Sequence, residues 1–324
     1  MYAFVNCMRI FIAFLVITGS AAKHRRPFWI IGHMVNDIHQ LKEFLKLGAN
    51  AIEADVKFLA KGIPWQTYHG VPCDCFRICT KKSCIKSYLN YVRLLTTKKG
   101  KITEVAEFIV MLSIIISMYS HLIYNPRFSL LLLDLKTYQI NAWDLKKAGK
   151  MFAHLLYFNL FDLKGKKSSL KVLLGVEKVS HKDFILGFLE ETRDKKFNFE
   201  NRIGWQISEN EHYSDIHKMW EEIHEIKNIW YSDGITNCFI LPRGKYRAID
   251  LLRKRKKCVS EEDSFCPRKF YMWSVDYKIS IRSFWRYIDG VITNEPAYVK
   301  GLIDNDYKAY LRYATPYDDA WSKY

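Results

Sequence analysis

A series of short apolar runs, separated by stretches with helical periodicity, constrains this chain more than any other feature. Nine runs have the length and composition of β-strands, and their alternation with helices predicts an α/β fold. The clearest helix follows the first run, where apolar residues recur at helical spacing until Gly48. The candidate strands are Phe28–Gly32, Ala51–Val56, Trp65–His69, Phe128–Leu133, Lys171–Val176, Ile203–Ile207, Asn228–Tyr231, Phe270–Val275 and Gly290–Thr293.

The third run breaks the alternation of strands and helices. Only Lys57–Pro64 separates it from the second run, and its residues Lys61–Pro64 indicate a turn instead of a helix. We therefore expect these two strands to form a hairpin beyond the barrel rim, with His69 at its tip. Eight strands remain, which predicts a single (β/α)8 TIM barrel. Such barrels commonly take about 250 residues, so the 324-residue chain needs no second domain.

The N-terminus has the features of a signal peptide. Arg9 is the only charge before the apolar run Ile10–Ile17, and small residues up to Ala22 resemble a cleavage site. The run is too short to span a bilayer, so we expect no transmembrane anchor. We interpret residues 1–22 as a signal peptide and residues 23–324 as the secreted catalytic domain, which we expect to be a monomer.

The charge pattern favours a membrane surface over nucleic acid as the anionic partner. The net charge of +16 favours an anionic partner, although it also serves solubility. The basic run Arg253–Lys257 lacks the aromatic residues and motifs of a nucleic-acid site. The apolar stretch Phe108–Ile123 predicts a helix buried against the barrel, with membrane contact as the alternative.

Carboxylates gather at the predicted strand ends. Glu53 and Asp55 lie two residues apart on one strand and therefore point the same way. Asp134 follows another apolar strand, and Lys136 lies two residues further on. Catalytic groups of β/α barrels gather at the carboxyl ends of strands, where like charges would repel unless a cation were present. Three carboxylates in this arrangement predict a Mg²⁺ site.

Two histidines accompany the carboxylates. His33 follows the first strand directly, and His69 precedes Gly70 in the extra hairpin. Each residue alone has an ordinary structural alternative, since a histidine can be a satisfied polar residue and Asp134 can cap a helix. Their joint placement at strand ends predicts one phosphate-binding catalytic site.

These residues lie in motifs through which the chain resembles the sphingomyelinase D (phospholipase D) toxins of spider venoms and their relatives. That family is built on the glycerophosphodiester phosphodiesterase barrel. The chain departs from it in a longer, more apolar connection before Phe128 and in extra cysteines. The matching segments span the mature chain: Ile31–Asn36, Gly48–Val56, Tyr68–Cys75, Asp134–Lys136, Ser232–Cys238, Trp273–Asp276, Ile292–Asn294 and the tail Ala314–Trp321.

The resemblance implies a role for each matching residue. His33 and His69 would be the catalytic pair, and Asp74 would orient His69. Lys136 would stabilise charge on the phosphate. Mg²⁺ would be bound by Glu53, Asp55 and Asp134. The substrate cleft would be lined by Tyr271, Trp273 and Asp276, with Asn294 supporting the site. Trp273 would hold a quaternary ammonium by a cation–π contact, or would simply be a core residue.

Cysteine usage fits an oxidising compartment. Without Cys7 of the signal peptide, seven cysteines remain, so at least one lacks a partner within the chain. The resemblance implies the disulfides Cys73–Cys79 and Cys75–Cys238. We expect Cys258 and Cys266 to pair with each other, which leaves Cys84 over.

The resemblance implies a secreted, Mg²⁺-dependent lyase. It would release choline or ethanolamine from sphingomyelin, ceramide phosphoethanolamine or lysophospholipids and form a cyclic phosphate. A covalent phosphohistidine route ending in hydrolysis is the mechanistic alternative. Two other functions stay open: a glycerophosphodiester phosphodiesterase acting on water-soluble diesters, and an inactive lipid-binding barrel.

Overall fold

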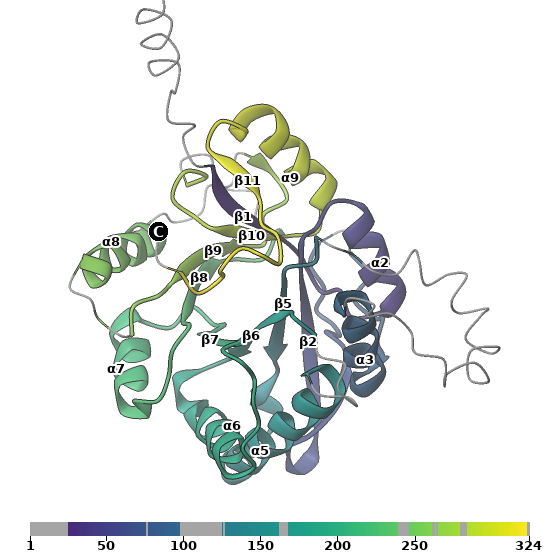
Figure 1. Cartoon of the computed structure of the whole chain (residues 1–324), viewed down its shortest axis with the longest axis vertical. Coiled ribbons are helices and arrows are strands. Elements are labelled where there is room, and N and C mark those ends of the chain that lie inside the picture. The colour runs from purple at the N-terminus through teal and green to yellow at the C-terminus, as the bar shows by residue number, and fades with distance from the viewer. Residues whose placement is uncertain are drawn as a thin grey trace, which may run out of the picture.

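Eight parallel strands form the centre of the molecule in the computed structural model, and helices surround them (Figure 1). The structure describes residues 25–75, 77–97, 125, 127–161, 168–238, 246–260, 263, 265–278 and 284–322. The signal-peptide prediction and the apolar stretch 108–123 fall outside these residues. The barrel strands are β1 (Arg26–Gly32), β2 (Ala51–Leu59), β5 (Leu130–Leu135), β6 (Lys171–Val176), β7 (Ile203–Ile207), β8 (Trp230–Gly234), β9 (Lys269–Trp273) and β10 (Gly290–Thr293).

The strand order confirms the predicted barrel. Neighbours run β7-β6-β5-β2-β1-β10-β9-β8, and every adjacent pair is parallel. A single parallel bridge between Trp205 and Ile229 joins the ends of this row and nearly closes the barrel. The strands are buried on both faces, which explains their continuous apolar runs. All eight carboxyl ends therefore meet at one rim, where the site residues of a β/α barrel gather.

Amphipathic helices cover the outside of the barrel. In the first of them, Leu41, Phe44 and Leu45 are buried, whereas Leu47 lies beyond the helix end and is 40% exposed. Asp37 caps this helix by accepting a hydrogen bond from the His39 backbone N–H. The helices are α2 (Ile38–Lys46), α3 (Ile85–Thr96), α5 (Leu145–Leu156), α6 (Lys182–Asp194), α7 (Tyr213–Ile223), α8 (Tyr246–Ser260) and α9 (Pro296–Leu302).

The extra hairpin is present, but its orientation corrects the expected position of His69. Strand β2 continues past the barrel, turns at Ala60–Gly62 and returns as β3 (Ile63–Thr67). Lys61 and Gly62 have positive φ, so the tip lies at these residues. His69 follows the returning strand, where the backbone N–H of Tyr68 donates to the Asp55 carbonyl. The hairpin thus brings His69 back to the rim. A short strand β4 (Ser83–Cys84), not expected from the sequence, extends it.

The C-terminal tail closes the opposite end of the barrel. Strand β11 (Leu311–Tyr313) pairs with the beginning of β1, and the tail then enters the barrel. Trp321 packs within the inner core and donates from its indole to the Asn201 carbonyl at 2.8 Å. At Gly204 an added Cβ would lie 2.4 Å from this indole ring, so glycine makes room for it. The tail therefore blocks this end of the barrel and leaves the carboxyl-end rim as the open mouth.

Three disulfides are present, and they are the three pairs expected from the sequence. Cys73–Cys79 and Cys258–Cys266 close short loops, whereas Cys75–Cys238 joins residues 163 apart. Cys84 is the free cysteine of the described chain and is exposed. Within the described residues, no helix is both long and apolar enough to cross a membrane.

Candidate active site

A cavity of about 810 Å³ opens at the carboxyl ends of the barrel strands. Its wall contains all but two of the residues that the sequence analysis assigned to chemistry or substrate contact; Asp276 and Asn294 lie behind it. Seven carboxylates and one lysine line the cavity, although the whole chain has a net charge of +16. The cavity is therefore acidic in a chain that is basic as a whole.

The acidic cluster results from strand register. Asp55 and Asp134 are direct register partners on β2 and β5, and Glu53 lies two residues before Asp55 on the same face. Oxygen atoms of these three residues all lie within 4.8 Å of one another. Asp134 Oδ1 is buried and has no hydrogen-bond partner among the described residues. Asp134 lies inside β5, because that strand runs two residues further than the sequence indicated.

Lys136 bridges two members of the acidic cluster. Its Nζ lies 2.9 Å from Asp55 Oδ1 and 2.6 Å from Asp134 Oδ2. Burial opposes ionisation of Asp55, but Lys136 and His69 outweigh it and lower the pKa of Asp55 to about 2. Burial, with the charges of Asp55 and Asp134, raises the pKa of Glu53 well above its usual range. The raised pKa of Glu53 reflects burial and carboxylates crowded together, and a divalent cation with oxygen ligands would relieve this repulsion and favour the ionised form of Glu53.

His33 is held by its Nδ1 atom. This nitrogen lies 3.1 Å from Asp74 Oδ2 and 3.1 Å from Asn294 Oδ1. Because both neighbours are acceptors, Nδ1 carries the proton and Nε2 is left for substrate. The expectation that Asp74 orients His69 is therefore wrong. The loop that carries Asp74 is tied to Cys238 after β8, and from there the Asp74 carboxylate reaches His33. Burial opposes ionisation of Asp74, yet hydrogen bonds from His33 and Thr236 hold its pKa well below the usual range.

His69 has a different partner. Its Nδ1 donates to the carbonyl oxygen of Gly70 at 2.6 Å, which again leaves Nε2 for substrate. Gly70 has a φ of 81°, a conformation that glycine adopts without strain, and this turn lets its carbonyl face the imidazole. Both histidines line the cavity together with the acidic cluster.

Comparison with known proteins identifies the family. The sequence model described as dermonecrotic toxin SPH matches residues 23–321. This chain belongs to the dermonecrotic toxin SPH family. It is 35% identical to dermonecrotic toxin Hl-PLD1 of Hemiscorpius lepturus, over 94% of this chain and 86% of the relative. It is 33% identical to dermonecrotic toxin SPH of Ixodes scapularis, over 98% of this chain and 82% of the relative.

A third relative and one solved structure are also similar to this chain. The chain is 33% identical to dermonecrotic toxin LlSicTox-betaIA1 of Loxosceles laeta, over 93% of this chain and 91% of the relative. A glycerophosphodiester phosphodiesterase of Thermotoga maritima aligns with 86% of this chain and 100% of its own, at 16% identity and a TM-score of 0.43. As a member of the SPH family, the chain is a phospholipase D-type phosphodiesterase.

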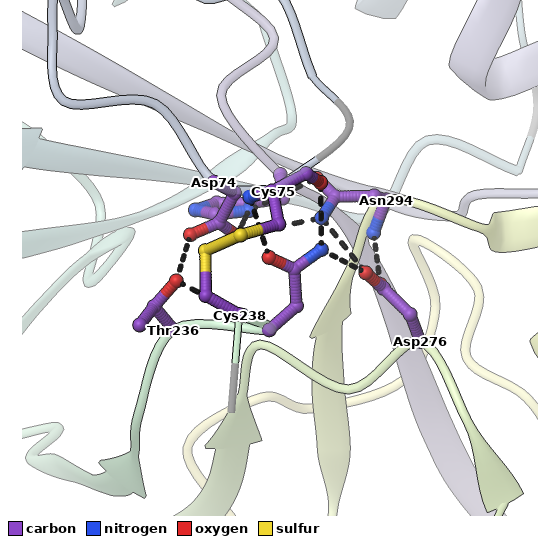
Figure 2. The surroundings of a disulfide bond; sticks show 8 residues. Asp74, Cys75, Thr236, Cys238, Asp276 and Asn294 are labelled. Atoms are coloured by element: carbon purple, nitrogen blue, oxygen red, sulfur yellow. Dashed lines mark hydrogen bonds and ion pairs between the residues drawn. A yellow bond between two sulfur atoms is a disulfide. The ribbon is translucent and has the colours of Figure 1, made fainter. Parts of the chain in front are cut away.

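In this SPH-family chain the long-range disulfide joins a polar network behind His33 (Figure 2). Asn237, next to Cys238, accepts from the Cys75 backbone N–H and donates to Asp276 Oδ2 at 2.7 Å. Asp276 in turn accepts from the backbone and side chain of Asn294. Asp276 and Asn294 thus support the loop that carries Asp74. Neither residue lines the cavity.

Tyr271 and Trp273 share one face of β9 and line the cavity. Tyr271 is 2% exposed, and its ring packs near Trp230 in the barrel interior. Trp273 stands one layer higher, is partly buried and forms part of the rim. Both side chains therefore reach the same cavity, at different depths.

Several site residues were missed by the sequence analysis. Arg77 donates to the His33 carbonyl and to Asn294 Oδ1 behind the catalytic histidine. Gln206 on β7 and Glu177 after β6 line the cavity wall. Burial, followed by the charge of Asp134, raises the pKa of Glu177 to about 7. Glu177 and Gln206 stand at carboxyl ends of predicted strands, and that position was the signal available in the sequence.

Proposed function

We propose that this chain is a secreted, Mg²⁺-dependent phospholipase D-type enzyme of sphingolipids and lysophospholipids. It releases choline or ethanolamine from sphingomyelin, ceramide phosphoethanolamine or lysophospholipids and leaves a cyclic phosphate. One observation carries the proposal. Two histidines, each engaged through Nδ1 and each with Nε2 left for substrate, line the same cavity as three carboxylates and a partly buried lysine.

The two histidines move the protons. A hydroxyl of the lipid attacks phosphorus and loses its proton to Nε2 of one imidazole. The bond between phosphorus and the head-group oxygen breaks, and the other histidine, protonated at Nε2, gives its proton to the departing alcohol. The step consumes no water, and its products are the cyclic phosphate and the free head group. Asp74 keeps His33 in the required tautomer and stabilises its protonated form.

The acidic cluster and Lys136 hold the phosphate. Glu53, Asp55 and Asp134 fit Mg²⁺ because they offer three clustered oxygen ligands, and Asp134 Oδ1 has no hydrogen bond among the described residues. When bound, Mg²⁺ supplies Lewis-acid polarisation of a phosphodiester oxygen. Lys136 adds a fixed positive charge beside it. Tyr271 and Trp273 contact the substrate, while Asp276 and Asn294 position the loop behind His33.

The proposal includes the organisation of the chain. Residues 1–22 act as a signal peptide and residues 23–324 form one secreted catalytic domain, which works as a monomer at a lipid surface. Three disulfides support an oxidising environment. A phospholipid-processing enzyme with a net charge of +16 would also be attracted to anionic membranes.

A lipid panel followed by ³¹P NMR tests this function. We expect the purified protein with Mg²⁺ to convert a sphingolipid or lysophospholipid to a cyclic phosphate with release of the head group. A monoester product would favour the phosphohistidine route instead. Turnover of glycerophosphocholine without turnover of lipid would indicate a glycerophosphodiesterase. Binding to vesicles with no turnover of any diester would indicate an inactive lipid-binding barrel.

A further inference from the structure

The cavity has two chemically different sides. One side carries the histidines, the acidic cluster and Lys136, which are described above. The other side comes from the carboxyl ends of β6 and β7 and has no assigned role. Its described polar residues are Glu177, Gln206, Ser208, Glu209, Asn210 and Glu211.

Strand register places Gln206 next to the catalytic side. Gly175 of β6 pairs with Asp134 of β5 on one edge and with Gln206 of β7 on the other. A Cβ added at Gly175 would lie 3.0 Å from Gln206 Nε2 and 3.5 Å from Asp134 Oδ1. The missing side chain of Gly175 therefore lets the Gln206 carboxamide extend across the barrel mouth toward the phosphate site.

Gln206 is buried without hydrogen bonds. It is 0% exposed, and neither its amide nitrogen nor its amide oxygen has a hydrogen-bond partner among the described residues. The Tyr271 hydroxyl is a polar neighbour of this amide in the barrel interior. A buried unpaired amide costs roughly 1–3 kcal/mol, so a group aimed into a cavity in this way indicates a ligand.

Glu177 supplies a carboxylate on the same side of the cavity. It lies two residues after Gly175, so both project to the same face, and it is 7% exposed. Its Oε2 accepts from the Tyr138 backbone N–H at 2.6 Å and from Thr137 Oγ1 at 3.5 Å. These contacts fix the carboxylate and leave Oε1 without a hydrogen bond among the described residues.

The other acids of the cavity are already engaged. Glu209 lies 3.8 Å from the Lys178 ammonium, and Glu211 accepts from the Val179 backbone N–H. Asp74 serves His33, and the acidic cluster serves the metal. Glu177 is the most buried of the three glutamates on this side of the cavity, so it is the one that a desolvated substrate cation would pair with.

We infer that Glu177 and Gln206 form the subsite for the head group and select a primary ammonium, as in ethanolamine, over trimethylammonium. An ammonium has three N–H donors, which match the acceptors Glu177 Oε1 and Gln206 Oε1. Trimethylammonium has no donor and would leave both acceptors buried and unpaired. It is best recognised by several aromatic faces, whereas the described part of this wall offers Tyr271 and Trp273.

This inference rests on the proposed function, and kinetics on two matched lipids tests it. Ceramide phosphoethanolamine and sphingomyelin of equal acyl composition are compared in the same detergent micelles at fixed Mg²⁺. We expect kcat/KM to favour the ethanolamine lipid by about 10-fold or more, the effect of leaving one buried acceptor unpaired. Glu177→Gln and Gln206→Leu should each lower this ratio by about 10-fold. Glu191→Gln, which changes a buried glutamate outside the cavity, should leave the ratio unchanged.

A measurement on the unmodified protein tests the same inference even if the variants fail to fold. Free ethanolamine should inhibit turnover at about 10-fold lower concentration than free choline. A preference for sphingomyelin, or a ratio that neither variant changes, would overturn the head-group subsite but not the proposed function. An equal loss on both lipids with a higher Mg²⁺ requirement would instead make Glu177 part of the metal site and also overturn it. Cleavage of neither lipid would overturn both.

Discussion

Asp74 Oδ2 lies 3.1 Å from Nδ1 of His33, and Thr236 Oγ1 donates to the other oxygen of the same carboxylate at 2.7 Å. The carboxylate therefore fixes which imidazole nitrogen carries the proton. Asp74→Asn should lower kcat by about 10²-fold or more with little change in KM, because the amide cannot stabilise the protonated imidazole. Thr236→Val leaves the carboxylate in place and should cost much less. Equal kcat values for Asp74→Asn and the unmodified protein would show that this pair has no catalytic role.

Metal removal tests the acidic cluster. Chelation, with metal loss verified by elemental analysis, should abolish turnover, and added Mg²⁺ should restore it. Mg²⁺ should also raise the melting temperature, since a ligand that binds only the folded state stabilises it. Asp55→Asn should lose this thermal shift. Full turnover in verified metal-free protein would refute the assignment of Glu53, Asp55 and Asp134.

The Cys75–Cys238 disulfide should contribute to both stability and turnover. It closes a loop of 163 residues and anchors the segment that carries Asp74 (Figure 2). Replacing both cysteines with serine should lower the free energy of unfolding by about 2–5 kcal/mol and reduce kcat. The same change at Cys258 and Cys266, which are 8 residues apart, should cost less and leave kcat unchanged. Recovery of Cys75 as a free thiol in peptide mapping would contradict the pairing.

Lys269, at the closed end of the barrel, should make the free energy of unfolding depend on pH. It is 0% exposed, and burial lowers the pKa of its ammonium to about 7, although Asp289 opposes the shift. Between pH 7 and about 10 the unfolded chain therefore binds more protons at this residue, and stability rises with pH.

The variant Lys269→Met lacks this titration. Its stability relative to the unmodified protein should fall by about 2 kcal/mol between pH 7 and pH 9, measured by chemical denaturation. Lys254→Met, on the outer helix α8, serves as the control. A stability difference for Lys269→Met that is constant over this range would show that the lysine stays charged.

The sequence was sufficient to predict the barrel and the side chains that lie together on one strand. Continuous apolar runs mark strands buried on both faces, and the spacing of Glu53 and Asp55 places their side chains on one face. Contacts that depend on register or on the path of a loop were not accessible in this way. The position of His69, the partner of Asp74 and the closeness of Gln206 to Asp134 all follow from how distant elements meet. The entry of Trp321 into the barrel depends on the gap at Gly204 in the same manner.

Turnover of His69→Asn at saturating lipid and Mg²⁺ tests the two-histidine account most directly. Asparagine keeps much of the shape and hydrogen-bonding of histidine but cannot transfer a proton at neutral pH. The account predicts that kcat falls by about 10²–10⁴-fold, while vesicle binding and melting temperature stay near those of the unmodified protein. His33→Asn should behave alike, and His154→Asn, outside the cavity, should keep full turnover. A folded His69→Asn protein with near-normal kcat would contradict the account.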